Sequence, residues 1–134
     1  MAIKTYKKGK AVTLSTNFKS TEFDCHGSGC CSSTKVDEKL VEYLQKIRDH
    51  FGKSVNINSG YRCLKVNEAV GGVPTSQHVL GQASDVGCSN PYEVAKLVKR
   101  MNLDFDQMGI YPSFVHLSYR SDGTNRRQVF YSSK

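Results

Sequence analysis

The sequence lacks a long apolar run. No segment approaches the roughly 20 apolar residues that a membrane-spanning helix requires, and the charged first residues are not followed by the apolar stretch of a secretory signal. We therefore expect neither membrane insertion nor such a signal. Without a signal, the five cysteines are expected to be reduced thiols or metal ligands rather than a disulfide framework.

Repeats, low-complexity tracts and an excess of glycine or proline are also missing. Eleven glycines and three prolines in 134 residues exclude collagen-like and low-complexity classes. A hydrophobic share of 38% and a charged share of 23% are those of an ordinary globular domain. Because the length favours one domain over two, we expect a single domain over residues 1–134, with residues 1–15 as a flexible basic N-terminus.

Acidic residues are outnumbered by basic ones. Nineteen Lys and Arg against twelve Asp and Glu give a net charge of +7. This charge draws a domain to polyanions such as nucleic acid, anionic lipid or the anionic polymers of a bacterial cell wall. The N-terminal lysines stand without any RNA-recognition, helix-turn-helix or zinc-finger pattern, and a solvated tail accounts for them. Nucleic acid is therefore not an expected partner.

Apolar periodicity predicts an α+β fold. Residues 36–51 carry apolar side chains at helical spacing, with Thr34 as the expected N-cap and Gly52 as the stop. Helical spacing also predicts helices over 64–70 and 90–102. Strands are expected within 53–62, 82–87, 105–111, 114–120 and 127–131. The expected architecture is an antiparallel β-sheet flanked by helices.

Three polar residues suggest a metal site. His78 and Asp85 lie seven residues apart, and a turn at Gly81 between them would bring both to one point. In the strand expected at 114–120, alternation places His116 on a polar face with Ser118 and Arg120. Three His and Asp ligands with a fourth position for water describe a catalytic zinc site. Spacing alone leaves open a hydrogen-bonded histidine and an aspartate that ends its strand.

Three blocks of sequence resemble the signature blocks of the M15 family of zinc peptidases. They are SGYR at 59–62, SQHVLGQASDV at 76–86 and YPSFVHLSYR at 111–120, in this order. NFKSTEF, LQKIRDHFG and NEAVGG are also similar, so the likeness covers roughly residues 18–120. The family includes D-Ala-D-Ala carboxypeptidases and peptidoglycan endopeptidases, and the small single-domain type occurs in phage and bacterial genomes. The resemblance implies a hedgehog-like fold with a zinc site in a cleft over the sheet.

The resemblance also implies roles for individual residues. His78, Asp85 and His116 would be the ligands of one catalytic Zn²⁺, and Arg62 would contact the scissile carbonyl or its developing oxyanion. By its residue type alone, Arg62 could instead be a surface arginine paired with a carboxylate. The residues expected to bind substrate or to orient the His78 loop are Tyr61, Ser76, Gln77, Ser118 and Arg120. For Ser118 and Arg120, a solvated sheet face is an equal alternative.

The sequence departs from the family pattern at the general base. Many relatives carry an acid three positions before or two positions after the last zinc histidine, where this chain has Ser113 and Ser118. Asp106 is our candidate catalytic base, and the alternative is that it caps or salt-bridges the sheet. Without a base, hydrolysis would lose a contribution of about 10²- to 10⁴-fold.

The cysteine-rich segment DCHGSGCC suggests a second metal. It supplies Cys25, His26, Cys30 and Cys31. A closed structural zinc site normally draws on a second, well-separated pair of ligands, which Cys63 or Cys88 would have to provide. The alternatives are buried thiols that pack as small hydrophobic groups, or a disulfide.

The expected function is zinc-dependent hydrolysis of peptide bonds in the stem or cross-bridge of peptidoglycan. The enzyme would be a D,D-carboxypeptidase or an endopeptidase of the phage endolysin kind, acting as a monomer. The alternative is a catalytically weak or inactive M15-fold domain that binds the cell wall through its positive charge. Two locations are compatible with these functions, namely the cytoplasm until release or the bacterial cell wall.

Overall fold

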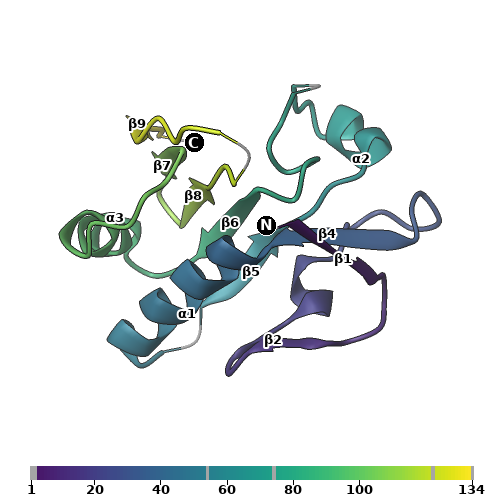
Figure 1. The fold of residues 1–134 in the computed structure, drawn as a ribbon. Coiled ribbons are helices and arrows are strands. Elements are labelled where there is room, and N and C mark those ends of the chain that lie inside the picture. Colours follow the sequence, from purple (N-terminus) through teal and green to yellow (C-terminus); the bar gives the residue numbers. More distant parts are fainter. Residues whose placement is uncertain (1–2, 54, 74, 122, 134) are drawn as a thin grey trace.

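A computed structural model describes residues 3–53, 55–73, 75–121 and 123–133 of the chain, and its main element is a β-sheet whose strands lie between residues 56 and 131 (Figure 1). Within these residues the sheet has five strands in the order β5-β6-β8-β7-β9. Their bounds are Asn56–Ser59 for β5, Ala83–Gly87 for β6, Gln107–Ile110 for β7, Phe114–Ser118 for β8 and Gln128–Tyr131 for β9. Together with the helices, this sheet confirms the predicted α+β class.

The sheet is mixed, whereas the sequence predicted an antiparallel one. The β5–β6, β6–β8 and β7–β8 pairs are antiparallel, but β9 runs parallel to β7. Both edges of β8 are already occupied by β6 and β7, and the chain joins the sheet at the outer edge of β7. Because β8 ends beside the start of β7, β9 begins at that end and runs in the same direction.

Two helices cover one face of the sheet. They are α1 (Glu38–Phe51) and α3 (Pro91–Arg100), and their apolar sides bury Leu44, Ile47 and Val98 in one core with the strands. Helix α2 (Leu64–Ala69) buries only Asn67 and stands apart from that layer in Figure 1. Among the described residues, none of the helices combines the length and apolar character needed to cross a membrane.

The N-cap of helix α1 lies three residues after the expected one. Asp37 is the N-cap and its carboxylate accepts a hydrogen bond from the Lys39 amide at 2.8 Å. Thr34 was expected there and instead lies in strand β4 (Ser33–Asp37), with its hydroxyl bonded to the Asp24 carboxylate. The backbone of β4 is paired with a neighbouring strand over residues 33–37, so the helix begins only after this strand ends. Gly52 ends the helix as predicted, in the left-handed conformation.

The N-terminal segment forms strands that the sequence did not predict. Strand β1 (Ile3–Lys7) pairs antiparallel with β4, and β2 (Thr13–Ser15) pairs with β3 (Phe18–Lys19), which leads into the short helix η1 (Ser20–Phe23). Most side chains of β1 are exposed, so its sequence carries no buried apolar alternation to reveal it. Backbone pairing with β4, rather than burial, holds this segment in place.

Successive side chains of β6 and β8 point alternately to the two faces of the sheet, one packed against the helices and one open. Val86 and Val115 are fully buried against the helices and are direct partners across the two strands. Asp85 and His116 are the neighbouring pair, so their side chains point to the other face of the sheet. The sheet therefore presents an acid and a histidine, side by side, away from the helical layer.

The loop that leads into β6 is packed tightly against β4. Gly81 has a φ of +77°, its carbonyl accepts from the Asp37 amide at 2.9 Å, and an added Cβ would lie 2.6 Å from the Lys35 carbonyl oxygen. A side chain at this position therefore meets both an unfavourable backbone conformation and rigid backbone atoms. This contact fixes the start of β6, two strand positions before Asp85.

We expect Gly81→Ala to destabilise the protein more than Gly52→Ala. Both glycines have positive φ, but an added Cβ at Gly52 meets nothing within 4 Å. The conformational cost at Gly52 is about 1–2 kcal/mol, and crowding against Lys35 should add about 1–3 kcal/mol at Gly81. Urea unfolding of both variants measures the difference. Equal losses of unfolding free energy would contradict the packing described here.

Candidate metal centre and substrate cleft

His78, Asp85 and His116 meet at one point on the open face of the sheet. Asp85 comes from β6 and His116 from the neighbouring β8, while His78 enters from the loop before β6. The Asp85 Oδ1 atom lies 2.9 Å from His116 Nδ1 and 3.3 Å from His78 Nε2. One candidate ligand atom from each residue lies within 4.8 Å of the others. The structure thus brings together the three residues that the sequence predicted as metal ligands.

Backbone contacts fix the ring of His78. Its Nδ1 donates to the Gly60 carbonyl at 2.7 Å, because a carbonyl can only accept. The tautomer with hydrogen on Nδ1 leaves a lone pair on Nε2, and this atom is buried without a hydrogen-bond partner. The Ser76 hydroxyl accepts from the His78 amide at 3.2 Å, and the His78 carbonyl accepts from the Arg62 amide at 3.1 Å. These contacts aim Nε2 at Asp85.

The donor atoms fit a zinc ion. Zinc lies about 2.0–2.2 Å from imidazole nitrogen and carboxylate oxygen, so two ligands of a tetrahedral ion are roughly 3.4 Å apart. The separation of His78 Nε2 from Asp85 Oδ1 matches that value at 3.3 Å. A buried lone pair facing a carboxylate oxygen without a hydrogen between them is stabilised when a cation binds both.

Asp85 is held in its anionic form. Burial alone would raise the pKa of its carboxyl, but the hydrogen bond from His116, the close approach of His78 and the charge of either ring when protonated outweigh burial and hold the pKa well below its usual range. A metal ligand must be deprotonated, so this carboxylate is ready to bind a cation over a wide pH range.

The three residues lie in a cleft of about 420 Å³. It is lined by Arg62, Gly72, Val73, Thr75, Ser76, Gln77, His78, Asp85, Gln107, Tyr111, Phe114, His116 and Arg126. Arg62, Ser76 and Gln77 were predicted from the sequence to belong to the site. Another cavity, of about 480 Å³ between β2 and α1, has neither histidine nor cysteine in its lining, so the chemistry points to the first.

The other residues predicted to bind substrate do not line this cleft. Ser118 is fully buried, and its hydroxyl accepts from the Gln107 amide at 3.0 Å. The Arg120 amide donates to the Asn125 side chain in the turn after β8. Tyr61 follows β5, and its amide donates to the Phe23 carbonyl at 2.8 Å. These three residues hold the surrounding chain segments instead of facing the cavity.

Arg62 reaches the cleft with much of its hydrogen-bonding capacity free. Its Nε is buried without a hydrogen-bond partner, and its Nη1 lies 3.5 Å from the Asn67 side-chain oxygen. Asn67 is itself fixed because its amide nitrogen donates to the Val73 carbonyl at 2.7 Å. A guanidinium with unmet donors in a cleft is suited to bind a carbonyl oxygen or a carboxylate.

Arg126 is the second cation of the cleft, and sequence reasoning missed it. Its guanidinium forms two hydrogen bonds, of 2.9 Å and 2.7 Å, to the two oxygens of Asp106. It follows a polar turn and precedes β9, where neither motif nor periodicity marked a functional residue. Only the return of the chain to the edge of β7 brings Arg126 to the cleft.

Asp106 makes the salt bridge that was the alternative to its role as general base. Its carboxylate is fully buried, and the hydrogen bonds from Arg126 hold its pKa below the usual range despite desolvation. Asp85 is the one carboxylate among the described residues that line the cleft. The geometry gives Asp106 a positioning role, namely to hold Arg126 at the wall of the cleft.

A family model of peptidase M15 matches residues 16–118 of the chain. The chain therefore belongs to the peptidase M15 family, as the three sequence blocks predicted. A comparison with curated proteins finds no match. The matched region contains His78, Asp85 and His116 as well as Arg62, and it ends before Arg126.

We expect Asp106→Asn to destabilise the protein by about 2 kcal/mol at neutral pH, the value for a hydrogen bond to a charged group. The folded pKa of Asp106 is lowered, so its stabilisation is complete above about pH 4, the usual pKa of an unfolded carboxyl. This stabilisation disappears as the pH falls through the lower folded pKa of Asp106. The difference in unfolding free energy between the unsubstituted protein and Asp106→Asn disappears with it. Urea unfolding across the acid range measures this.

Asp104→Asn is the matched control, because Asp104 forms an exposed ion pair with Arg127. This change should lower the free energy of unfolding by less than about 1 kcal/mol. Losses of the same size at pH 7 for both variants would mean that the Asp106 pair contributes no more than a surface pair.

Proposed function

We propose that the protein is a zinc-dependent metallopeptidase that cleaves peptide bonds in the stem or cross-bridge of peptidoglycan. One observation carries the proposal: the buried, unpartnered Nε2 of His78 faces the Asp85 carboxylate beside His116. Membership of a peptidase family supports hydrolysis as the reaction. Two imidazoles and a carboxylate are a donor set typical of catalytic zinc.

His78, Asp85 and His116 would hold the metal, which leaves room for water and substrate on the side of the cleft. Bound zinc lowers the pKa of its water towards neutrality and polarises the substrate carbonyl. Gly60 keeps the His78 ring in the tautomer that presents Nε2, and Asp85 stays anionic between the two rings. The chain thus supplies a pre-oriented site that needs no rearrangement of its strands.

Arg62 would stabilise the charge that develops on the carbonyl oxygen. Its unmet Nε donor is fixed by the rigid chain around Gly60 and by Asn67, so little reorganisation accompanies the reaction. A guanidinium already in place stabilises an oxyanion more than a neutral carbonyl, and this difference lowers the barrier.

The charge of the cleft fits a peptide that carries carboxylates. Arg62 and Arg126 are the cations among the described residues that line it, and the whole chain has a net charge of +7, which favours association with the anionic cell wall. A carboxypeptidase needs a cation for the terminal carboxylate, and Arg126 is in a position to be that group. An endopeptidase would use the same arginine for a side-chain carboxylate of the stem. The enzyme would act as a monomer.

The first test is mass spectrometry of peptides released from purified peptidoglycan by the zinc-loaded protein. We expect release that stops in the presence of a chelator. Loss of a single D-alanine would identify a carboxypeptidase, whereas cleavage between two stem or cross-bridge residues would identify an endopeptidase. Release that continues in the chelator would contradict zinc dependence.

We expect His116→Ala to lose both hydrolysis and the zinc ion of this site while keeping its fold. His116 is partly exposed, at 17%, so its removal leaves the apolar core intact. Metal analysis, circular dichroism and the release assay measure the three properties. His50→Ala is the control, because His50 lies exposed near the end of α1 and should leave all three unchanged.

Arg62→Ala should lower kcat by about 10²- to 10³-fold, the effect of removing one oxyanion donor. Zinc content should stay at the value of the unsubstituted protein, because Arg62 holds no metal. Steady-state kinetics on a released-peptide assay, together with metal analysis, separate the two effects. An unchanged kcat would remove Arg62 from the reaction.

The absence of a free carboxylate among the described lining residues supports a second candidate function, that of a wall-binding domain with little or no catalysis. General-base help is worth about 10²- to 10⁴-fold, so its loss would leave a slow enzyme or none. Sedimentation with peptidoglycan that is insensitive to chelator, with no peptide released at near-neutral pH, favours this candidate. Any metal-dependent release excludes it.

A further inference from the structure

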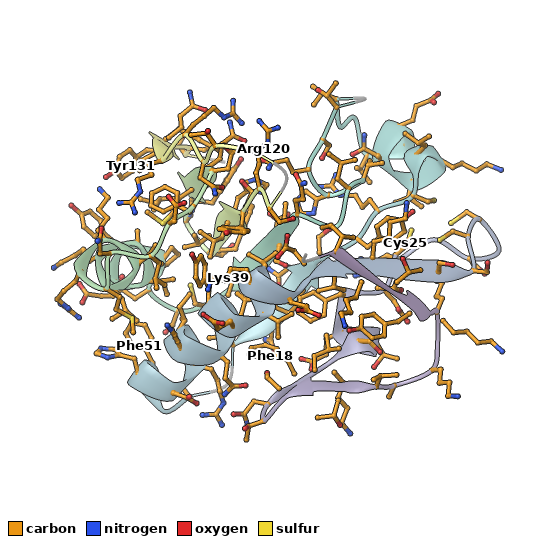
Figure 2. The ribbon with its side chains drawn as sticks, viewed as in Figure 1. Phe18, Cys25, Lys39, Phe51, Arg120 and Tyr131 are labelled. Atoms are coloured by element: carbon orange, nitrogen blue, oxygen red, sulfur yellow. The ribbon has the colours of Figure 1, made fainter. Side chains whose placement is uncertain are left out.

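Four cysteine sulfurs gather at a second site, away from the sheet. Cys25, Cys30 and Cys31 lie in the loop between η1 and β4, and Cys63 directly precedes α2. The Sγ separations are 3.9 Å for Cys25–Cys30, 3.7 Å for Cys25–Cys63, 3.8 Å for Cys30–Cys31 and 3.3 Å for Cys30–Cys63. All four sulfurs lie within 4.8 Å of one another. Cys25 is labelled in Figure 2, where sulfur is yellow.

These separations fit a metal better than a disulfide. Zinc binds thiolate sulfur at about 2.3 Å, so two sulfurs of a tetrahedral site lie roughly 3.8 Å apart. The sulfurs of a disulfide lie about 2.05 Å apart, and all four cysteines are free thiols in the structure. Packing as small hydrophobic groups requires no mutual contact among four sulfurs, whereas a metal site requires it.

The surrounding chain is shaped to the four sulfurs. An added Cβ at Gly27 would collide with Cys30 Sγ and would lie 2.5 Å from a methyl group of Val66, so the loop closes only with glycine there. Lys8 reaches the same loop from the end of β1: its Nζ donates to the Gly27 carbonyl at 2.6 Å and lies 3.7 Å from Cys31 Sγ. Four thiolates around a divalent cation carry a net negative charge, which this ammonium partly balances.

We propose that Cys25, Cys30, Cys31 and Cys63 bind a structural Zn²⁺ ion, distinct from the ion held by His78, Asp85 and His116. A site with four protein ligands leaves no open position for water, so its role is to hold the chain. A closed site draws its ligands from separate segments of chain, and here the loop supplies three cysteines and Cys63 supplies the fourth. Cys63 supplies the distant ligand that the sequence left undecided between it and Cys88.

The site would position the catalytic cleft. Cys63 is the next residue after Arg62, and the same short segment carries the Gly60 carbonyl that fixes the His78 ring. The Tyr61 amide also donates a hydrogen bond to the Phe23 carbonyl, and Phe23 lies two residues before Cys25 in the segment that carries the loop cysteines. A zinc ion would lock these two segments together, so Cys63 and its partners would act as positioning residues for Arg62.

The test is the absorption spectrum of the Co²⁺-substituted protein prepared under reducing, oxygen-free conditions. Cobalt bound by thiolates gives intense sulfur-to-metal charge-transfer bands in the near ultraviolet, and imidazole and carboxylate ligands do not. We expect these bands in the unsubstituted protein and at full strength in His116→Ala, which lacks the other metal site. They should be lost in the Cys30→Ser, Cys63→Ser double variant.

Cys88→Ser is the matched control. Cys88 lies beside Phe51 and Val55, outside the cluster, so this variant should keep the bands. Zinc content should fall from about two ions per chain to about one in both His116→Ala and the double cysteine variant. Alkylation gives a further readout: with zinc bound, Cys88 should react and the other four cysteines should be protected until a chelator is added.

Absence of thiolate bands from the unsubstituted protein overturns the proposal, as does equal alkylation of all five cysteines in the zinc-loaded protein. If the double variant does not fold, the spectra of the unsubstituted protein and of His116→Ala still decide. The bands do not depend on hydrolysis, so a wrong assignment here is distinguishable from a failure of the proposed peptidase activity.

Discussion

The direct pairing of Asp85 with His116 across β6 and β8 is the constraint on which the rest of the site depends. Antiparallel register places the two residues opposite each other, and a slip of one residue would turn one of them into the core. The neighbouring pair, Val86 with Val115, prevents that slip because both are fully buried under the helices. Burial on one face of the sheet therefore fixes the chemistry on the other.

Local patterns made much of this fold predictable. The helix over α1, its end at Gly52 and the alternation of β8 follow from short-range spacing. The set of His78, Asp85 and His116 follows from two of the family blocks. Features that depend on partners distant in sequence were missed. The strand β1 has little apolar character, and the parallel direction of β9 depends on which sheet edge is free.

Partners that are distant in the sequence also explain why sequence reasoning misplaced or missed some residues of the site. Ser118 shares the face of His116 by alternation, but it is fully buried, and its hydroxyl accepts a hydrogen bond from the Gln107 backbone. For Asp106 the sequence left both a general base and a salt bridge open, because its partner Arg126 is twenty residues away. Cys63 could not be joined to the loop cysteines by spacing, since the whole of α1 lies between them.

The parallel strand β9 and the arginine before it have a further consequence. The segment that matches the peptidase family ends at residue 118, so the wall of the cleft that carries Arg126 is built from chain beyond that segment. In the same C-terminal segment, the Phe130 ring packs near the metal ligands, with its centre 6.4 Å from that of His116. The three candidate metal ligands and the Arg126 wall thus come from different parts of the chain. The C-terminal strand can therefore differ between relatives without a change in the ligand set.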